Sequence, residues 1–209
     1  MTVIIAIAVR PKEKELPYFL MASDSKRILM QEDEQGVLHT VKVEEDFKKI
    51  HMVGNRVLGI AGKIEEEFIV ELIATLAETN IDFEAFARRA FELTKNHILN
   101  KSQFEFARCN VVIGENRNYQ PKLAQFLIIK NDKNESTFNI ASPEIGNAIP
   151  VRIGNVQGTD DLFERFCVRA RNAVNLNSYV VKKAAKEYIE EVAERVPEFC
   201  NKNVVFKKI

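Results

Sequence analysis

The second residue of the chain is a threonine, and a threonine at a chain terminus can act as a hydrolytic nucleophile. Thr2 follows Met1, and because Thr is small and uncharged, we expect methionine aminopeptidase to remove Met1. The new terminus would carry a hydroxyl and an α-amine on one residue. The amine has an ordinary pKa of about 7.7–8.0, so its neutral fraction can take the hydroxyl proton directly or through a water. Because many proteins begin Met-Thr, this interpretation requires further residues to support it.

An acid stands at the end of an apolar stretch in "MASDSKRI", residues 21–28. Asp24 has a serine on each side and is followed by two basic residues. One interpretation is a turn at a strand end, where Asp and Ser are common. In the other, the carboxylate holds a lysine, whose charge lowers the pKa of a terminal amine by like-charge repulsion. The residues of this stretch alone leave both interpretations open.

The overall composition excludes some classes of partner. The chain is 46% hydrophobic and 29% charged, as in ordinary folded proteins. Thirty basic residues balance thirty acidic ones, which gives no support to nucleic acid or a membrane surface as a partner. This neutral balance is compatible with assembly into oligomers. No apolar run could span a bilayer, and "TVIIAIAV" lacks the basic flank of a signal peptide.

The cysteines and histidines show no metal-ligand or disulfide pattern. Three scattered cysteines argue against a disulfide framework and favour a reducing, cytoplasmic location. His39, His51 and His97 lack metal-ligand spacing, so we interpret each as a surface or core residue and predict no metal site. No Gly-rich phosphate loop is present, and we predict no cofactor.

The hydrophobic pattern predicts two groups of strands, each followed by a pair of helices. Strands are expected at 2–9, 18–23, 47–53, 56–62, 108–115, 123–131, 136–142 and 203–209, with a projecting hairpin at 31–46. Helices are expected from after residue 62 to about 76, at 82–99 with Asp82 as N-cap, from about Thr159, and at 178–195. Two antiparallel sheets flanked by helix pairs would bury every amphipathic face. We therefore predict an α+β fold, a four-layer α-β-β-α sandwich, with residues 1–209 as a single domain.

Four stretches of the chain resemble proteasome β subunits and their bacterial ring-forming relatives, which are N-terminal-nucleophile hydrolases. "TVIIAIAV" is similar to their first strand, and "LMASDSKRI" to the small-small-Asp-Ser-Arg motif that ends the second strand. "FKKIHMV" is similar to their Lys-Lys-Ile strand, and "VLGIAGKIEEEFIVELIATLA" to the Ala-Gly turn that begins the first helix. The order of strands and helices over the whole chain also agrees with that fold.

The resemblance implies a role for individual residues. Thr2 would be the nucleophile, and Lys49 would tune its amine and hydroxyl. Asp24 would orient Lys49, and the backbone N–H of Gly62 would bind the oxyanion. Without the resemblance, Asp24 is interpreted as a turn residue and Lys49 as an exposed strand lysine. The residues implied to line an apolar pocket for the side chain before the cut are Ile60, Ile64 and His51.

The implied activity is that of a threonine peptidase that cleaves peptides inside a homo-oligomeric ring or spiral, with an AAA+ ATPase as a candidate partner. Two stretches depart from the family pattern. "IGNVQG", with Asn155, replaces the Gly-Ser-Gly turn before the third helix, and "PEFCNKNVVF" replaces the Asp-x-x-Ser motif. These departures favour an alternative, a catalytically silent proteasome-like assembly or binding protein. An N-terminal-nucleophile amidase that acts on a small amide is a further alternative.

Overall fold

A computed structural model of the 209-residue chain describes residues 3–13, 15–32, 35, 38–77, 81–154, 157–172 and 177–209. Met1, Thr2 and Asn155 lie outside these ranges. The strands are β1 (Ile4–Arg10), β2 (Tyr18–Ser23), β3 (Arg27–Glu32), β4 (Leu38–Glu44), β5 (Ile50–Val53), β6 (Arg56–Gly62), β7 (Ala107–Arg117), β8 (Gln120–Lys130), β9 (Glu135–Ala141), β10 (Asn147–Ile153) and β11 (Val205–Lys208). The helices are α1 (Glu66–Ala77), α2 (Phe83–Asn96), the π-helical segment η1 (His97–Lys101), α3 (Asp160–Asn172) and α4 (Ser178–Arg195).

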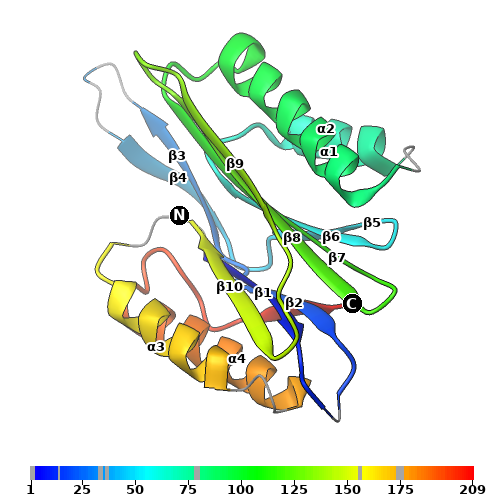
Figure 1. Cartoon of the computed structure of the whole chain (residues 1–209). Coiled ribbons are helices and arrows are strands. Elements are labelled where there is room, and N and C mark those ends of the chain that lie inside the picture. The colour runs from blue at the N-terminus through cyan, green and yellow to red at the C-terminus, as the bar shows by residue number, and fades with distance from the viewer. Residues whose placement is uncertain are drawn as a thin grey trace.

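The elements form four layers, as Figure 1 shows. One antiparallel sheet has the order β10-β1-β2-β11, and the other has the order β5-β6-β7-β8-β9. Helices α1 and α2 cover the outer face of the five-stranded sheet, and α3 and α4 cover the outer face of the four-stranded sheet. The predicted four-layer α-β-β-α fold of two antiparallel sheets is confirmed.

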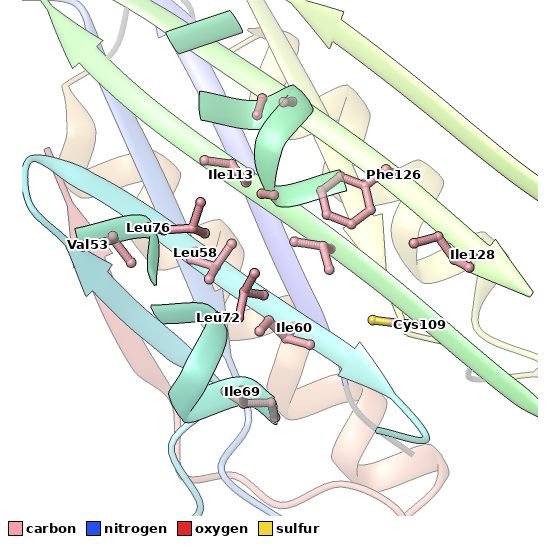
Figure 2. Packing of buried hydrophobic residues seen from close by; sticks show 14 of the residues in the cluster. Val53, Leu58, Ile60, Ile69, Leu72, Leu76, Cys109, Ile113, Phe126 and Ile128 are labelled. Carbon is pink, nitrogen blue, oxygen red and sulfur yellow. The ribbon is translucent and has the colours of Figure 1, made fainter. Parts of the chain in front are cut away.

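Three hydrophobic clusters fill the spaces between these layers. Under α1 and α2, side chains such as Leu58, Leu72 and Phe126 pack together, as Figure 2 shows. Between the sheets lie Ile4, Phe19 and others, and a third cluster lies beneath α3 and α4. Because side chains alternate across a strand, β6 sends Leu58 to the helices and its neighbours to the other sheet. Burial of each large apolar side chain contributes about 1.5–3 kcal/mol.

The sequence pattern predicted no strand at β10, and this prediction was wrong. Residues 147–153 contain Pro150, which cannot donate to a ladder and argues against a central strand. The strand lies at the edge of its sheet and pairs with β1 from Ile4↔Ile153 to Arg10↔Asn147. At an edge, a proline can turn its nitrogen away from the single neighbour, so the strand tolerates it.

Other predicted boundaries differ by a few residues. Asp82 is the N-cap of α2, and its carboxylate accepts the N–H of Ala85 at 2.9 Å. The helix predicted to reach residue 99 changes at Asn96 into η1. The strand predicted at 47–53 begins only at Ile50, which leaves Lys49 just outside its ladder. The predicted hairpin is present as β3 and β4, which extend away from the layers in Figure 1.

Candidate active site

Asp24 is a buried carboxylate that three donors surround. It follows the last residue of β2 and is fully buried. Its Oδ1 accepts hydrogen bonds from Lys49 Nζ at 2.8 Å and from the N–H of Val3 at 3.0 Å. Its Oδ2 accepts the N–H of Lys26 at 3.1 Å. The carboxylate therefore joins Lys49 to the backbone of the residue that follows Thr2.

Lys49 is equally enclosed, with its side chain 1% exposed. Its carbonyl accepts the N–H of Ile60 at 3.3 Å, which fixes its backbone against β6. Burial lowers the pKa of Lys49, and the neighbouring Asp24 carboxylate opposes part of that change. A buried ion pair gives little net stability, because desolvation offsets the attraction between its charges. A perturbed pair of this kind is instead a candidate for chemistry.

Cys200 lies beside the pair but is a poor nucleophile. It is 2% exposed, and burial, followed by the charge of Asp24, raises the pKa of its thiol to about 12. Because only the thiolate reacts readily, this cysteine stays inert at neutral pH. The described residues bring together no group of three or more His, Cys, Asp or Glu that could hold a metal ion.

Gly62 ends β6 with a conformation that only glycine adopts easily. Its φ is 135°, and an added Cβ would lie 1.9 Å from the carbonyl oxygen of Arg108. The N–H of Ile60 points to Lys49 and the N–H of Lys63 points to Arg108. Because N–H groups alternate in direction along a strand, the N–H of Gly62 points away from β7. Strand β5 begins opposite Gly59, so this N–H extends past the end of that ladder.

The turn after Gly62 is anchored through Glu65, which sequence reasoning missed. The Glu65 carboxylate accepts Ser102 Oγ at 2.7 Å and the N–H of Gln103 at 3.1 Å, and contacts His97 Nε2 at 2.9 Å. Burial raises the pKa of Glu65, but the hydrogen bonds from His97 and Ser102 outweigh it, and the pKa lies below its usual value. This anchor fixes the start of α1, and no short motif in the sequence indicates it.

The three residues expected to line a substrate pocket lie in different surroundings. Ile60 is 6% exposed and belongs to the cluster under α1 and α2, and Ile64 packs against the same cluster. His51 lines a pocket of about 600 Å³ together with residues 44–48 and one face of α1. Burial, and then the charge of Lys48, lowers the pKa of His51 and so favours its neutral ring.

Comparison with solved structures identifies the fold. No protein-family model and no curated protein matches the chain. Eukaryotic HslV from Trypanosoma brucei is 15% identical, with a TM-score of 0.53 over 98% of this chain and 98% of that chain. Thiobacillus denitrificans BPH, solved in complex with epoxomicin, is 15% identical, with a TM-score of 0.55 over 99% of this chain and 97% of that chain.

The chain has the fold of HslV and BPH. At this level of identity the likeness establishes the fold, and the roles of the site residues stay predictions. Within the fold, the predicted contact between Asp24 and Lys49 is present at 2.8 Å. Helices of the described ranges are all too short or too polar to cross a membrane.

Proposed function

We propose that this protein is a threonine-type peptidase that uses Thr2 as its nucleophile after Met1 has been removed. The observation that carries the proposal is the buried Lys49–Asp24 pair, whose carboxylate also accepts the N–H of Val3. That bond ties the backbone next to Thr2 to the lysine. The fold shared with HslV and with the epoxomicin complex of BPH supports the same chemistry.

Each proposed group has a defined part in the reaction. The Thr2 hydroxyl attacks the peptide carbonyl while its proton passes to the α-amine, and Lys49 lowers the pKa of both groups by its charge. The N–H of Gly62 stabilises the oxyanion, a contribution of about 10²–10³ in kcat for one donor. The C–N bond then breaks, the leaving amine takes the proton from the α-ammonium, and water hydrolyses the ester to restore Thr2.

The proposal extends to substrate and assembly. The substrate is a peptide, with Ile60, Ile64 and His51 favouring an apolar side chain before the cut. The protein works in the cytoplasm as a homo-oligomeric ring or spiral, and an AAA+ ATPase would feed it. The formal net charge of zero supports assembly, because identical subunits do not repel one another strongly.

The test is the intact mass of the protein before and after treatment with a peptide epoxyketone, which needs both the free α-amine and the hydroxyl of an N-terminal threonine. We expect loss of Met1 followed by one adduct per chain, and no adduct on Thr2→Ala. Retained Met1 without an adduct would contradict the proposal and favour the silent assembly protein. Loss of Met1 without an adduct in the assembled protein would also contradict it.

The silent alternative has a specific observation in its favour. Cys200 and Asn201 occupy the segment before β11 where the Asp-x-x-Ser motif of the proteasome family is expected. Neither residue supplies that hydroxyl. The amidase alternative would be favoured by an active particle of monomer size, 23.9 kDa, that hydrolyses a small amide and leaves peptides intact.

A further inference from the structure

The Lys49–Asp24 pair joins segments from two different sheets. Asp24 follows β2 in the four-stranded sheet, and Lys49 precedes β5 in the five-stranded sheet. The separation of these two segments therefore sets the distance between ammonium and carboxylate. No ladder hydrogen bond between β2 and β5 is available to fix it, because the strands belong to different sheets.

Asn201 connects these two segments from a third. Its Oδ1 accepts the N–H of Ser25 at 3.1 Å, next to Asp24. Its Nδ2 donates to the carbonyl of Glu45 at 2.8 Å and to Glu45 Oε2 at 2.7 Å. One amide group thus bridges the residue after Asp24 and the segment that leads to Lys49.

Ser25 completes the connection. Its hydroxyl donates to the carbonyl of Glu45, and its own carbonyl accepts the N–H of Phe47 at 2.7 Å. Phe47 is two residues before Lys49. We call the contacts among Ser25, Glu45, Phe47 and Asn201 the bracket. Its bonds are mostly to backbone atoms, so it positions the chain itself.

The chemistry of the bracket requires an amide at position 201. An asparagine side chain presents an acceptor and two donors at once, and Asn201 uses both kinds. A carboxylate of the same shape would only accept, and it would face the carbonyl and carboxylate of Glu45. The change from Asn to Asp therefore replaces the two hydrogen bonds to Glu45 with repulsion between oxygen atoms, and it leaves the side-chain volume almost unchanged.

We propose that Asn201 is a positioning residue for the reaction and that it holds Asp24 and Lys49 at their working separation through the bracket. This inference rests on the proposed peptidase function. Asn201 touches no reacting group, and its effect passes through Ser25 and Glu45. A displacement of about 1 Å in a catalytic group can cost about 100-fold in rate.

The test compares Asn201→Asp with Asn203→Asp. Asn203 is exposed and lies two residues further along the same segment, so its variant carries the same chemical change outside the bracket. For Asn201→Asp we expect kcat for peptide hydrolysis, and the rate of epoxyketone adduct formation, to fall about 10–100-fold with KM little changed. For Asn203→Asp we expect both within about 2-fold of the parent.

Rescue separates positioning from simple destabilisation. In the Asn201→Asp background, Glu45→Gln supplies an amide donor to the new carboxylate but leaves the Glu45 carbonyl opposite it. We therefore expect the double variant to recover part of the lost rate. Glu45→Gln alone keeps an acceptor for Asn201 Nδ2, and its rate is the reference against which the double variant is compared. If Asn201→Asp keeps the parent's rate, or if Glu45→Gln restores nothing while both variants are fully folded, the inference is wrong.

Amide hydrogen exchange tests the role of Asn201 independently of the proposed peptidase function. The N–H groups of Lys26 and Phe47 bond to Asp24 and Ser25, and both should exchange faster in Asn201→Asp than in Asn203→Asp. If the parent forms no epoxyketone adduct, the proposed function is wrong, and this exchange alone decides whether the bracket holds the pair. Unchanged exchange at both amides would overturn the bracket whatever the activity.

Discussion

At the scale of single residues, the buried Lys49–Asp24 pair adds little net stability, so we expect its main role to be in the reaction. Lys49→Met leaves the Asp24 carboxylate buried without its ammonium, which we expect to lower the free energy of unfolding by about 3–5 kcal/mol. The double variant Asp24→Asn, Lys49→Met removes both charges and should regain most of that loss. Its peptidase activity should stay absent.

Guanidinium unfolding and the epoxyketone adduct measure the two effects separately. Recovery of stability without activity would show that the charges serve the reaction. A double variant that hydrolyses peptides at the parent's rate would remove Asp24 and Lys49 from the mechanism. A single variant as stable as the parent would show that the carboxylate needs only its backbone donors.

The cysteines provide a second test at this scale. Cys109 and Cys200 are buried, and burial raises the pKa of each thiol to about 12. At pH 8 such a thiol is almost wholly protonated, whereas about a quarter of thiols with an ordinary pKa of 8.5 are ionised. We therefore expect iodoacetamide to modify at most Cys167 in the folded protein. Intact mass should show three adducts only after denaturation, and rapid modification of Cys200 would contradict its burial.

The sequence predicted the contact between Asp24 and Lys49, which is present, and missed the residues that support it. Asp24 and Lys49 were found because short motifs of a known family surround each of them. Val3 and Asn201 were missed, because Val3 contributes only its backbone N–H and Asn201 is 176 residues from its partner Ser25. Such contacts depend on which distant segments of the chain the fold brings side by side, which no local pattern encodes.

At the scale of elements, the two sheets approach closely where Phe19 of β2 faces Gly114 of β7. A Cβ at Gly114 would lie 2.1 Å from the Phe19 ring. Gly114→Ala should therefore destabilise the protein by several kcal/mol, since overpacking forces a shift in side chains or backbone. Adding Phe19→Leu removes the ring and should recover part of the loss.

A double-mutant cycle on unfolding free energies measures this contact. We expect a coupling of about 1–3 kcal/mol between the two positions. Gly59→Ala offers a comparison in the same layer, because its Cβ would meet mainly the flexible end of Met21 and should be tolerated better. If Gly114→Ala unfolds no more easily than Gly59→Ala, the two sheets do not approach as closely at Gly114 as the structure indicates.

Glu65 anchors the start of α1, and its pKa gives the anchor a pH dependence. Because the folded pKa lies below the ordinary value, the ionised carboxylate stabilises the fold above the unfolded pKa of about 4.3. This contribution is lost as the pH falls through the folded pKa. Glu65→Gln should therefore cost about 1–2 kcal/mol at pH 7 and progressively less below pH 4.3.

Urea unfolding at several pH values checks this prediction. Glu67→Gln is the matched control, because Glu67 is exposed in the first turn of the same helix. A difference between parent and Glu65→Gln that stays constant from pH 7 to pH 3 would exclude an ionised anchor.

Element prediction succeeded where periodicity was strong and failed at edges. The apolar positions of α4 fixed its bounds, Ser178–Arg195, because seven of its residues are buried on one face. Strand β10 and the segment η1 were missed because tertiary contacts, and not local preference, decide both. Because β10 lies at the edge of its sheet, it tolerates Pro150. The π-helical geometry of η1 has no signature in the sequence.

At the scale of the whole molecule, the layers bring the site together at the junction of the two sheets. β2 carries Asp24 to that junction from one sheet, and the segment before β5 carries Lys49 from the other. The predicted sandwich followed from counting amphipathic faces, which is a property of the entire chain. The distance between the two sheets could not be predicted in this way, because it depends on contacts between individual residues such as Phe19 and Gly114.

The proposed oligomer requires a contact surface, and the β3–β4 hairpin is suited to supply it. Val41 and Val43, both on β4, are 60% and 46% exposed. A two-stranded sheet alone is only marginally stable in water, and contact with a second subunit would cover these side chains. We expect the protein to sediment as a multiple of 23.9 kDa.

Val41→Lys with Val43→Lys should shift the sedimentation of the protein toward the monomer, because lysine on an exposed strand opposes association without disturbing the strand. Val168→Lys on α3 is the control, since Val168 is 57% exposed and lies outside the hairpin. Circular dichroism should show both variants folded. A monomeric parent would contradict the oligomer, and a double variant that assembles like the parent would place the contact elsewhere on the surface.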